Sequence, residues 1–600
     1  MTDSGNVRSI KTIKRATKID SPPPLTTAVK NWLAMLPLTN INLSVRRIIH
    51  SLRKLKSQAH PLSANHWFEI LELFHPKVDY FSTQLRTKYL SDISSRTQKE
   101  KQRYIVLAYL MNNEIAQCYS DLTRSTTIIQ PNREQLTISY YRAISYLTQI
   151  LVASYELYLQ TPIQLWQHLN QLYHSAEKNN LENVVFKDPT ETLFTVEKKS
   201  ISNAYKRALL LASANPYQLS RIDIEKLFNV LLYWSDRTQI DSVHQPKDLY
   251  IIDLASNKGP HYVVLVNSVK TVESYRALHT VDLSHYLEKI LSELPSHLTT
   301  IKFSSEEKTT LNRALVESLM QHWSNRKMRF ADRIPHQGEL HVCVGLSATH
   351  YYLNQESEAY STMASSLKLA PTKYDHIPEV PLAPASAPCA SLISAPKNQT
   401  LALDTPIKTA KKELKHPIGL NFELSKANKL SLTKRLPKKH EKQLWQIVNR
   451  SDEGYCLQPS LHSLSHIQPG VIIGIQQKNQ ASNATLQIYA IRWIQSNSDK
   501  SFVVGVQLLA FKADPIAVEG NRQLHQLRGL LLNDIGNPSQ KMTIIIPAIP
   551  YKTGDIVKIS NQYQQYLVKL LDQLVINHSY GQFSYTLLTT GNLRRWANSL

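Results

Sequence analysis

The fold of the second half of the chain is decided by the segment "LWQIVNRSDEGYCL", which runs from Leu444 to Leu457. It begins as an apolar, strand-like run, ends in the polar stretch Asn449-x-Ser451-x-x-Gly454, and then resumes as apolar residues. A strand that stops at a short polar turn containing glycine and then restarts is typical of places where backbone and small polar side chains meet a ligand. An ordinary β turn has the same pattern, so both interpretations stay open at this point.

Other short strand-like runs follow this segment at even spacing. They are "VIIGIQQ", "ATLQIYAIRWIQ" and "SFVVGVQLLAF", and then "MTIIIPAI", "GDIVKIS" and "QFSYTLL". Strands this short and evenly spaced predict a small barrel followed by a second small β unit. The preceding stretch, 354–430, is rich in Pro, Ala, Ser and Lys, a composition that cannot build a core and predicts a linker.

The N-terminal half has helical rather than strand-like patterns. In "NLSVRRIIHSLRKLK" the apolar residues recur at helical spacing behind Ser44, the expected N-cap, and Arg and Lys take the remaining face. The run "LSANHWFEILELF" predicts a helix that ends before His75-Pro76. Helical patterns continue over 96–125 and 132–160. We therefore expect an all-helical domain, and between about 245 and 325 a mixture of strands and helices.

The formal net charge of +22 is the strongest global signal. A basic surface attracts polyanions, so nucleic acid, anionic lipid and small phosphates are all compatible partners, and simple solubility is an equal alternative. No stretch reaches the ~18 apolar residues of a membrane span. The first 24 residues are polar and basic without an apolar core, which is not the pattern of a secretory signal, so we expect a cytoplasmic protein.

The sequence contains no familiar catalytic or metal-binding motif. Its four cysteines lack CxxC or CxxH spacing, which argues against a zinc site and a disulfide framework. The patterns GxxxxGK[ST], GxGxxG, GxSxG and HExxH are also missing. We therefore expect a protein that is not an enzyme and has neither a metal nor a cofactor.

Together, the strand order and the polar motif resemble a PilZ domain, the bacterial receptor module for cyclic di-GMP. Asn449, Ser451 and Gly454 match the family's (D/N)xSxxG motif, Arg492-Trp493 ends a barrel strand, and Gly505 lies in the strand that closes the barrel. The resemblance covers roughly 440 to 515. The helical region is also similar to the long N-terminal part of a group of uncharacterised proteobacterial proteins that end in such a domain.

The family's second motif, RxxxR, precedes its first strand, and here the chain offers two candidates. Arg435 and Lys439 form RxxxK just before Trp445, and Arg329 and Arg333 form a full RxxxR upstream. The segment after the upstream motif, "HVCVGLSATHYYL", aligns without gaps with "WQIVNRSDEGYCL". We interpret this likeness as two related β elements separated by the Pro-rich insertion, either a degenerate domain beside a working one or a pair that shares one site; chance similarity is the third possibility.

The resemblance implies a cyclic di-GMP site, and the chemistry of the residues suits that ligand. Arginine pairs with phosphate oxygens and makes bidentate contact with guanine, and Asn and Ser can bond to a guanine edge. The predicted ligand-binding set is Arg329, Arg333, Arg435, Lys439, Asn449, Ser451 and Gly454. We expect a receptor that transmits cyclic di-GMP binding to an unidentified protein partner. The alternative is a PilZ-like scaffold that has lost its ligand; nucleic acid binding has no motif to support it.

The expected fold is a multidomain α+β chain. It has an N-terminal all-α domain, a mixed α/β middle region, and a C-terminal PilZ-like β-barrel plus a small β unit. The expected segments are a basic tail (1–24), the helical domain (25–240), the mixed region with a possible degenerate PilZ-like element (241–353), the linker (354–430), the barrel (431–520) and the last β unit (521–600).

Overall fold

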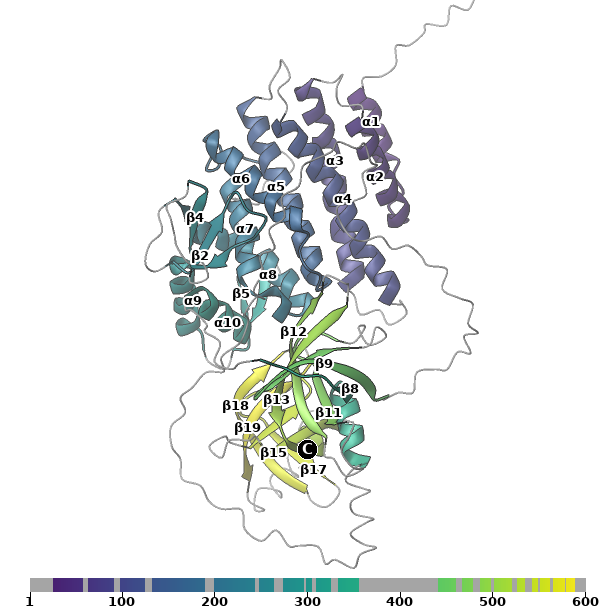
Figure 1. Ribbon diagram of the computed structural model, residues 1–600, viewed down its shortest axis with the longest axis vertical. Coiled ribbons are helices and arrows are strands. Elements are labelled where there is room, and N and C mark those ends of the chain that lie inside the picture. The colour runs from purple at the N-terminus through teal and green to yellow at the C-terminus, as the bar shows by residue number, and fades with distance from the viewer. Residues whose placement is uncertain are drawn as a thin grey trace, which may run out of the picture.

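The structure is a computed structural model in which helices α1 to α10 and a small sheet lie in one half of the molecule and two β-barrels in the other (Figure 1). It describes residues 25–57, 63–90, 98–124, 132–188, 199–242, 248–263, 273–295, 298–304, 309–324, 333–355, 441–459, 467–477, 486–497, 501–520, 526–534, 542–548, 551–561, 565–577 and 579–588. The expected N-terminal tail, and the expected linker apart from its first two residues, lie outside this set.

Among the described residues of the N-terminal domain, eight segments are α-helices. They are α1 (Leu25–Ala34), α2 (Ile41–Ser57), α3 (Ala64–Leu90), α4 (Gln98–Arg124), α5 (Arg133–Glu156), α6 (Ile163–Lys178), α7 (Ile201–Ser213) and α8 (Arg221–Trp234). Helix α5 lies at the centre, packed against α4, α6, α7 and α8. A capping box starts it, in which Asn132 Oδ1 accepts from the Gln135 N–H at 2.8 Å and the Gln135 side chain accepts from the Asn132 N–H. The predicted all-α domain is confirmed.

Helix α3 does not end before His75-Pro76, as the sequence predicted, but continues through Pro76 to Leu90. Proline lacks the N–H that would bond to the preceding turn, which normally breaks a helix. Here the apolar stripe continues on both sides of the proline through the buried residues Phe74 and Val78. Packing of that stripe outweighs the lost hydrogen bond, because most helical stability in proteins comes from tertiary burial.

Ser44 is not the N-cap of α2, because the helix already begins at Ile41. Asn40 takes the capping role, with its Oδ1 accepting from the Leu43 N–H at 3.1 Å. The buried Ser44 hydroxyl instead donates to the carbonyl of Pro37 at 2.8 Å, in the connection between α1 and α2. This bond ties that connection to α2.

The middle region combines a small antiparallel sheet with two helices. Its elements are β1 (Gln239–Asp241), β2 (Tyr250–Asp253), β3 (His261–Tyr262), β4 (Tyr275–His279), α9 (Val281–Glu293), β5 (Thr300–Lys302), β6 (Thr310–Asn312) and α10 (Arg313–Ser324). Trp323 of α10 packs edge-on against Trp234 of α8 at 5.9 Å between ring centroids, and its Nε1 donates to Ser213 of α7 at 2.9 Å. The helical domain and the mixed region therefore share one hydrophobic core.

Six strands form the first barrel, and one of them comes from before the Pro-rich insertion. They are β8 (Glu339–Val344), β9 (Gln443–Ser451), β10 (Gly454–Gln458), β11 (Ile472–Gln477), β12 (Gln487–Ser496) and β13 (Phe502–Ala510), with the short β7 (Ile334–Pro335) added beside β9. Strand β8 pairs with β9 on one side and β11 on the other, and the β9–β10 pairing closes the ring. A barrel has no exposed sheet edges, so closure requires β8.

This topology corrects the expectation of two related β elements. Residues 445–457 form the hairpin β9–β10, whereas the aligned segment 341–353 consists of the end of β8 followed by a helical stretch, residues 346–355. The similar apolar patterns reflect two strands of one barrel, which pair with each other antiparallel, with His341 opposite Leu444. The likeness therefore marks neighbours in one sheet, and the described residues 333–355 contribute strands to the first barrel rather than forming a separate PilZ-like element.

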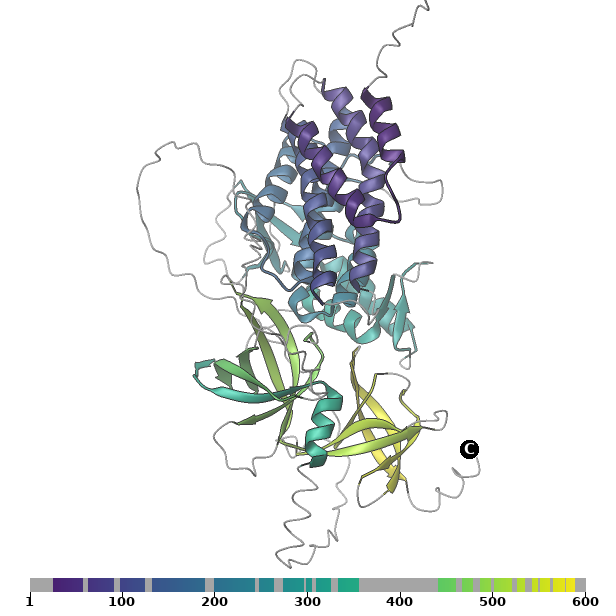
Figure 2. The same ribbon diagram turned by 90° about the vertical axis from the view of Figure 1, so that its right-hand side faces the viewer.

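A second closed barrel follows directly. It consists of β14 (Lys512–Gly520), β15 (Leu527–Asp534), β16 (Thr543–Ile546), β17 (Ile556–Ser560), β18 (Gln565–Ile576) and β19 (Gly581–Leu588). Because β14 belongs to it, the expected boundary between 520 and 521 is too late by one strand. The two barrels lie side by side, and the helical stretch 346–355 packs between them through buried Ala348 and Leu353 (Figure 2).

Tyr158, just after α5, joins the helical domain to the first barrel. Its ring is 2% exposed and packs in the barrel core with Trp445, Ile494 and other inward-facing residues. Its backbone is left-handed, with φ of 56°, and its carbonyl accepts from the Ser496 N–H at the end of β12 at 2.8 Å. The Gln160 N–H also donates to Ser496 Oγ, at 3.1 Å. A non-glycine residue adopts this conformation only where its surroundings hold it.

Candidate functional site

A bulge in β9 turns the motif residues to the outside of the first barrel. Trp445 and Ile447 point into the barrel core. The pairing of β9 with β10 then shifts by one residue at Val448, so that Asn449 opposes Cys456 and Ser451 opposes Gly454, while Tyr455 and Leu457 point inward. Without the bulge, strict alternation would send Asn449 and Ser451 into the core. The extra residue is what makes this strand end available to a ligand.

Asn449 belongs to a row of residues that crosses four strands on the outer face, which we call the outer-face row: Asn449, Cys456, Gly505 and Trp493. Directly opposed residues in antiparallel strands share a face. Gly505 makes room for the indole of its neighbour, because a Cβ there would lie 1.9 Å from Trp493 Nε1. A second bulge, at Arg492 in β12, lets Trp493 point outward although Ile491 and Ile494 face the core.

Arg333 covers one end of the outer-face row. Its guanidinium carbon lies 5.6 Å from the ring centroid of Trp493, close enough for a cation–π contact. The next two residues form β7, which pairs with β9 beside Asn449 and Arg450 and so holds Arg333 in place. Burial raises the pKa of the Cys456 thiol, and the nearby Arg333 charge opposes that rise. Arg333, Trp493 and Asn449 thus come together from three separate parts of the chain.

The other two motif residues lie at the β9–β10 turn. The Ser451 hydroxyl donates to the Gly454 carbonyl at 3.4 Å, a long bond that leaves the hydroxyl weakly engaged. Gly454 has a packing reason to be glycine, since a Cβ there would lie 1.9 Å from the carbonyl oxygen of Val506 in β13. Its role in the structure is therefore to let β10 and β13 approach each other.

Three of the predicted ligand-binding residues, Arg329, Arg435 and Lys439, lie outside the described residues. The strand order nevertheless separates the two arginine motifs. Strand β8 is the first of the six barrel strands along the chain, and Arg329-x-x-x-Arg333 comes before it, followed by the short β7. Arg435-x-x-x-Lys439 precedes β9, which is the second strand. The motif that comes before the first strand is thus the intact pair of arginines, whereas the RxxxK motif at 435–439 comes before the second strand in the sequence.

The arrangement fits recognition of a ligand better than catalysis. A guanidinium lies over an aromatic ring on a barrel face that also carries the Asn449 amide, and the Ser451 hydroxyl lies at the end of the same strand. Such groups can bind phosphate oxygens and a planar base. Burial raises the pKa of Cys456, the thiol in the row, which lowers its fraction of reactive thiolate. Among the described residues, no group of three or more His, Cys, Asp and Glu is placed to hold a metal ion.

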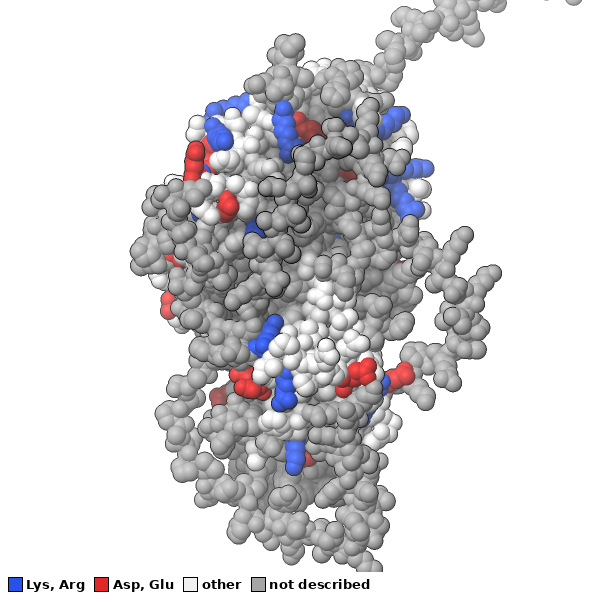
Figure 3. Space-filling model, viewed as in Figure 1, with Lys and Arg blue, Asp and Glu red and all other residues white. Residues whose placement is uncertain are grey.

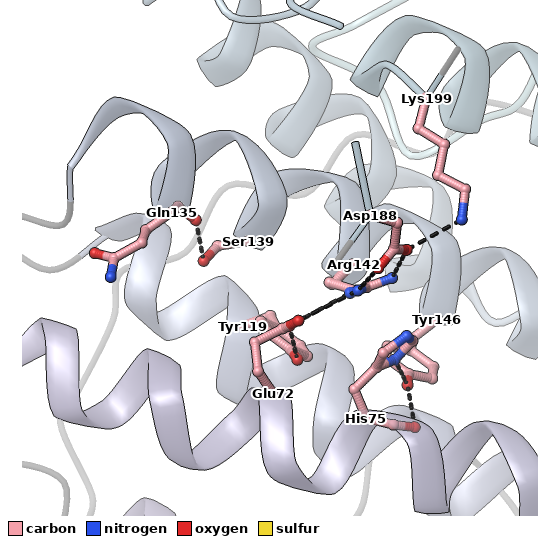
Figure 4. Close-up of polar contacts among 9 residues, drawn as sticks. All are labelled: Glu72, His75, Tyr119, Gln135, Ser139, Arg142, Tyr146, Asp188 and Lys199. Carbon is pink, nitrogen blue, oxygen red and sulfur yellow. Dashed lines mark hydrogen bonds and ion pairs between the residues drawn. The ribbon is translucent and has the colours of Figure 1, made fainter. Parts of the chain in front are cut away.

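A second polar cluster lies inside the helical domain and has a structural explanation. We call it the buried ionic cluster: Glu72, Tyr119, Arg142, Asp188 and Lys199. Arg142 donates to both carboxylate oxygens of Asp188 at 2.7 Å and to Glu72 at 3.2 Å, and Lys199 lies 3.0 Å from Asp188 (Figure 4). Tyr119 donates to Glu72 at 2.6 Å. Its charges are buried and mutually paired, so the cluster ties α3, α4 and α5 to residues 188 and 199.

His75 adjoins this cluster and stays uncharged. Its Nδ1 lies 2.5 Å from the Tyr146 hydroxyl. Burial, and next the positive charge of Arg142, lower the pKa of His75 to about 3. A neutral imidazole at this position adds no further charge to the buried ionic cluster.

A six-stranded barrel with (D/N)xSxxG on its second strand and RxxxR before its first defines a PilZ domain, and the chain is a PilZ-domain protein. Three consecutive family models match it: "Cyclic-di-GMP receptor FimW, N-terminal domain" over 27–246, "Cyclic-di-GMP receptor FimW, middle PilZ domain" over 249–515 and "FimW C-terminal beta-barrel domain" over 514–588. The chain is 25% identical to Cyclic-di-GMP receptor FimW of Pseudomonas aeruginosa over 568 residues, which covers 93% of this chain and 90% of that protein. No solved structure matches the chain significantly.

The middle family model agrees with the observed topology, because its range of 249–515 places the residues before and after the insertion in one domain. Its end at 515 also lies closer to the start of β14 than the expected boundary at 520. In the part of the chain that is described, no helix has the length and apolar character needed to cross a membrane.

Sequence reasoning missed Trp493 as a site residue, although Arg492-Trp493 contributed to the resemblance. The available signal was Gly505, a glycine within a strand, which often marks a close approach by another group. The pairing of Gly505 with Trp493 depends on the bulge at Arg492 and was not predictable from either strand alone.

Proposed function

We propose that this chain is a cytoplasmic receptor that binds cyclic di-GMP on the outer face of its first barrel and passes the signal to a protein partner through its helical domain. The observation that carries the proposal is the outer-face row, with Arg333 over Trp493 and Asn449 on the same face. Membership of the PilZ class and similarity to a protein named as a cyclic di-GMP receptor support the choice of ligand.

In this proposal each residue has a defined chemical role. Arg329 and Arg333 pair with the phosphates and the guanine O6 and N7 edge, since a guanidinium fork fits both. The Trp493 ring stacks on a guanine or on the guanidinium, and Asn449 and Ser451 bond to the base edge. Gly454 acts indirectly, by keeping β10 against β13. Arg435 and Lys439, which precede the second strand, make no essential contact.

The route from ligand to helical domain runs along β12. This strand carries Trp493 in the outer-face row and, three residues later, Ser496, which bonds to Tyr158 and Gln160 of the helical domain. A ligand that binds one arrangement of this junction more tightly than another shifts the population toward it. We infer that the helical domain then presents a different surface to a protein partner, and that the chain works as a receptor rather than an enzyme.

Isothermal titration of the full-length protein with cyclic di-GMP, with GTP as the control ligand, tests the binding step. We expect saturable binding of cyclic di-GMP that Arg333→Gln, Arg329→Gln and Asn449→Ala each weaken about ten- to a hundredfold, as expected for the loss of one bidentate pair. Arg435→Gln is the matched control and leaves affinity unchanged. If wild type does not bind, or if only Arg435→Gln weakens binding, the proposed site is wrong.

Hydrogen exchange with and without saturating ligand tests the transmission step. We expect changed protection in β12 and in residues 157–160, where the helical domain meets Ser496. Binding without any change outside the first barrel would remove the transmission step and leave the binding step intact. Failure of both experiments would favour a scaffold that acts through protein contacts alone.

A further inference from the structure

The first two helices form a layer without acidic residues. Residues 25–57 contain six Lys or Arg and no Asp or Glu. Helix α2 buries Val45, Ile48, Ile49 and Leu52 against the domain and exposes its opposite side. In Figure 2 both helices lie at the surface that faces the viewer, side by side and in front of the rest of the helical domain. This layer therefore presents one broad face to the surroundings.

The exposed side of α2 is basic from Arg46 to Lys54. We call it the basic face: Arg46, Arg47, His50, Arg53 and Lys54, all exposed. Residues at i, i+3, i+4 and i+7 lie on one side of a helix, so these positions form a single stripe. Arg53 is paired with Glu114 at 2.6 Å, but Arg46, Arg47 and Lys54 form no ion pair with any residue that the structure describes. Figure 3 shows Lys and Arg gathered at this edge, over α1 and α2.

Apolar side chains project at one end of the basic face. Met35 is 78% exposed and Leu38 is 52% exposed, both in the connection between α1 and α2, and Leu43 in the first turn of α2 is 39% exposed. Leu43 lies on the same side of the helix as Arg46, Arg47 and Lys54, at i+3, i+4 and i+11. The connection thus places large apolar groups in water beside a row of unpaired cations.

We propose that the basic face, together with Met35 and Leu38, is a docking surface for an anionic lipid membrane. A negatively charged leaflet attracts Lys and Arg, and each basic residue at its surface raises membrane partitioning by about fivefold. Apolar side chains beside the cations add to the binding by entering the boundary between headgroups and acyl chains. The exposed Met35 and Leu38 favour this partner over nucleic acid, whose phosphates interact with the cations but offer nothing to a methionine or leucine side chain.

Co-sedimentation of the full-length protein with lipid vesicles tests the surface. We expect binding to vesicles of equal parts phosphatidylglycerol and phosphatidylcholine, and little binding to phosphatidylcholine alone. The triple variant Arg46→Gln/Arg47→Gln/Lys54→Gln should weaken binding by about a hundredfold, since three contributions of about fivefold multiply. The variant Met35→Ser/Leu38→Ser should weaken it by about tenfold through loss of apolar contact.

The matched control is Lys258→Gln/Lys289→Gln/Lys302→Gln, which removes the same charge from exposed lysines of the mixed region. It should change vesicle binding by no more than a few-fold. If it weakens binding as much as the α2 triple variant, the attraction is a general charge effect and the proposed surface is wrong. If the α2 triple variant binds vesicles as well as the wild type does, the vesicle binding comes from other parts of the chain and the proposed surface is wrong.

Binding to nucleic acid is the remaining alternative, and a DNA-binding measurement on the same variants tests it. Binding of a DNA duplex that the α2 triple variant weakens and Met35→Ser/Leu38→Ser leaves unchanged, without any vesicle binding, would overturn the membrane assignment. All the substituted residues are exposed, so unchanged circular dichroism should accompany each variant. These experiments need no cyclic di-GMP, so their outcome is independent of the proposed ligand site.

Discussion

Arg142 in the helical domain and Arg333 beside the first barrel are the same residue type in opposite surroundings. The Arg142 side chain is 3% exposed and its fork is closed on both sides by carboxylates. Arg333 is only partly buried and lies over the outer ring face of Trp493. Burial with full pairing makes Arg142 a structural residue, whereas Arg333 lies at the surface over an aromatic ring, where a ligand can approach its guanidinium.

The difference shows that residue type does not identify a site in this protein; the direction of the side chain does. Glu72 and Asp188 would attract attention in a sequence scan, yet both serve Arg142. Asn449 is an ordinary turn residue by type, and belongs to the outer-face row, the proposed ligand site, because a bulge turns it outward. The following predictions test this contrast between the buried ionic cluster and the outer-face row.

Replacing Arg142 by Met should have the largest effect on stability. The variant removes the guanidinium that pairs with both Asp188 and Glu72 inside the helical core, while the contacts of Asp188 with Lys199 and of Glu72 with the Tyr119 hydroxyl stay in place. Removing one partner of a buried pair costs about 3–5 kcal/mol. Urea unfolding followed by far-UV circular dichroism measures this loss, and cyclic di-GMP affinity should not change at temperatures where the variant is folded. A weakened affinity in the folded variant would mean that the buried ionic cluster is coupled to the outer-face row.

Gly454→Ala should destabilise the first barrel by about 2–3 kcal/mol. The added Cβ would meet the Val506 carbonyl at 1.9 Å, and backbone cannot move aside as a flexible side chain can. The matched variant is Gly554→Ala in the second barrel, which has no neighbour within 4 Å and suffers only from its φ of +92°, a cost of about 1 kcal/mol. Chemical denaturation of both variants gives the comparison. Equal losses would contradict the packing role of Gly454.

Acidification should weaken the helical domain through His75. The unfolded chain takes up this proton below about pH 6.5, whereas the folded protein takes it up only near pH 3, so the unfolded state binds more protons between these values. Stability therefore falls as pH falls, by ~2 kcal/mol between pH 7 and 5, and His75→Asn should remove that part of the slope. Burial raises the pKa of Asp79, so this carboxyl makes the folded state more stable as the pH falls, equally in the wild type and in His75→Asn. Identical pH profiles for the two proteins would contradict the assignment.

The sequence predicted the fold class and the barrel motif because both are encoded locally. Helical periodicity predicted helices where α2, α4, α5 and the first half of α3 lie, and Asn449, Ser451 and Gly454 lie within six residues of one another. The missed features depend on pairing across long distances. Strand β8 pairs with β9 although the long insertion separates them in the sequence, and no local pattern predicts that pairing. The bulges at Val448 and Arg492 each shift the alternation of inward and outward side chains by one residue, so the alternation predicts the wrong side of the barrel beyond them.

Tyr158 shows the same limit at the domain junction. An aromatic residue just after a helix is by pattern a core residue of that helix's own domain. It is a core residue, but of the barrel, and only the fold shows that its ring packs beside Trp445. Contacts between domains use the same residue types as contacts within them, so burial preference alone cannot assign the partner.

The smallest stability effect is expected for Arg333→Gln, and it is the sharpest test of the contrast with Arg142. Loss of a partly exposed cation–π contact should change the free energy of unfolding by no more than about 0.5 kcal/mol. The same variant should weaken cyclic di-GMP binding at least tenfold, because the lost donors face the ligand rather than a buried carboxylate. Denaturation and titration on one preparation measure both quantities. A variant that loses stability as Arg142→Met does, while keeping its affinity, would make Arg333 a structural residue and reverse the distinction drawn between the two arginines.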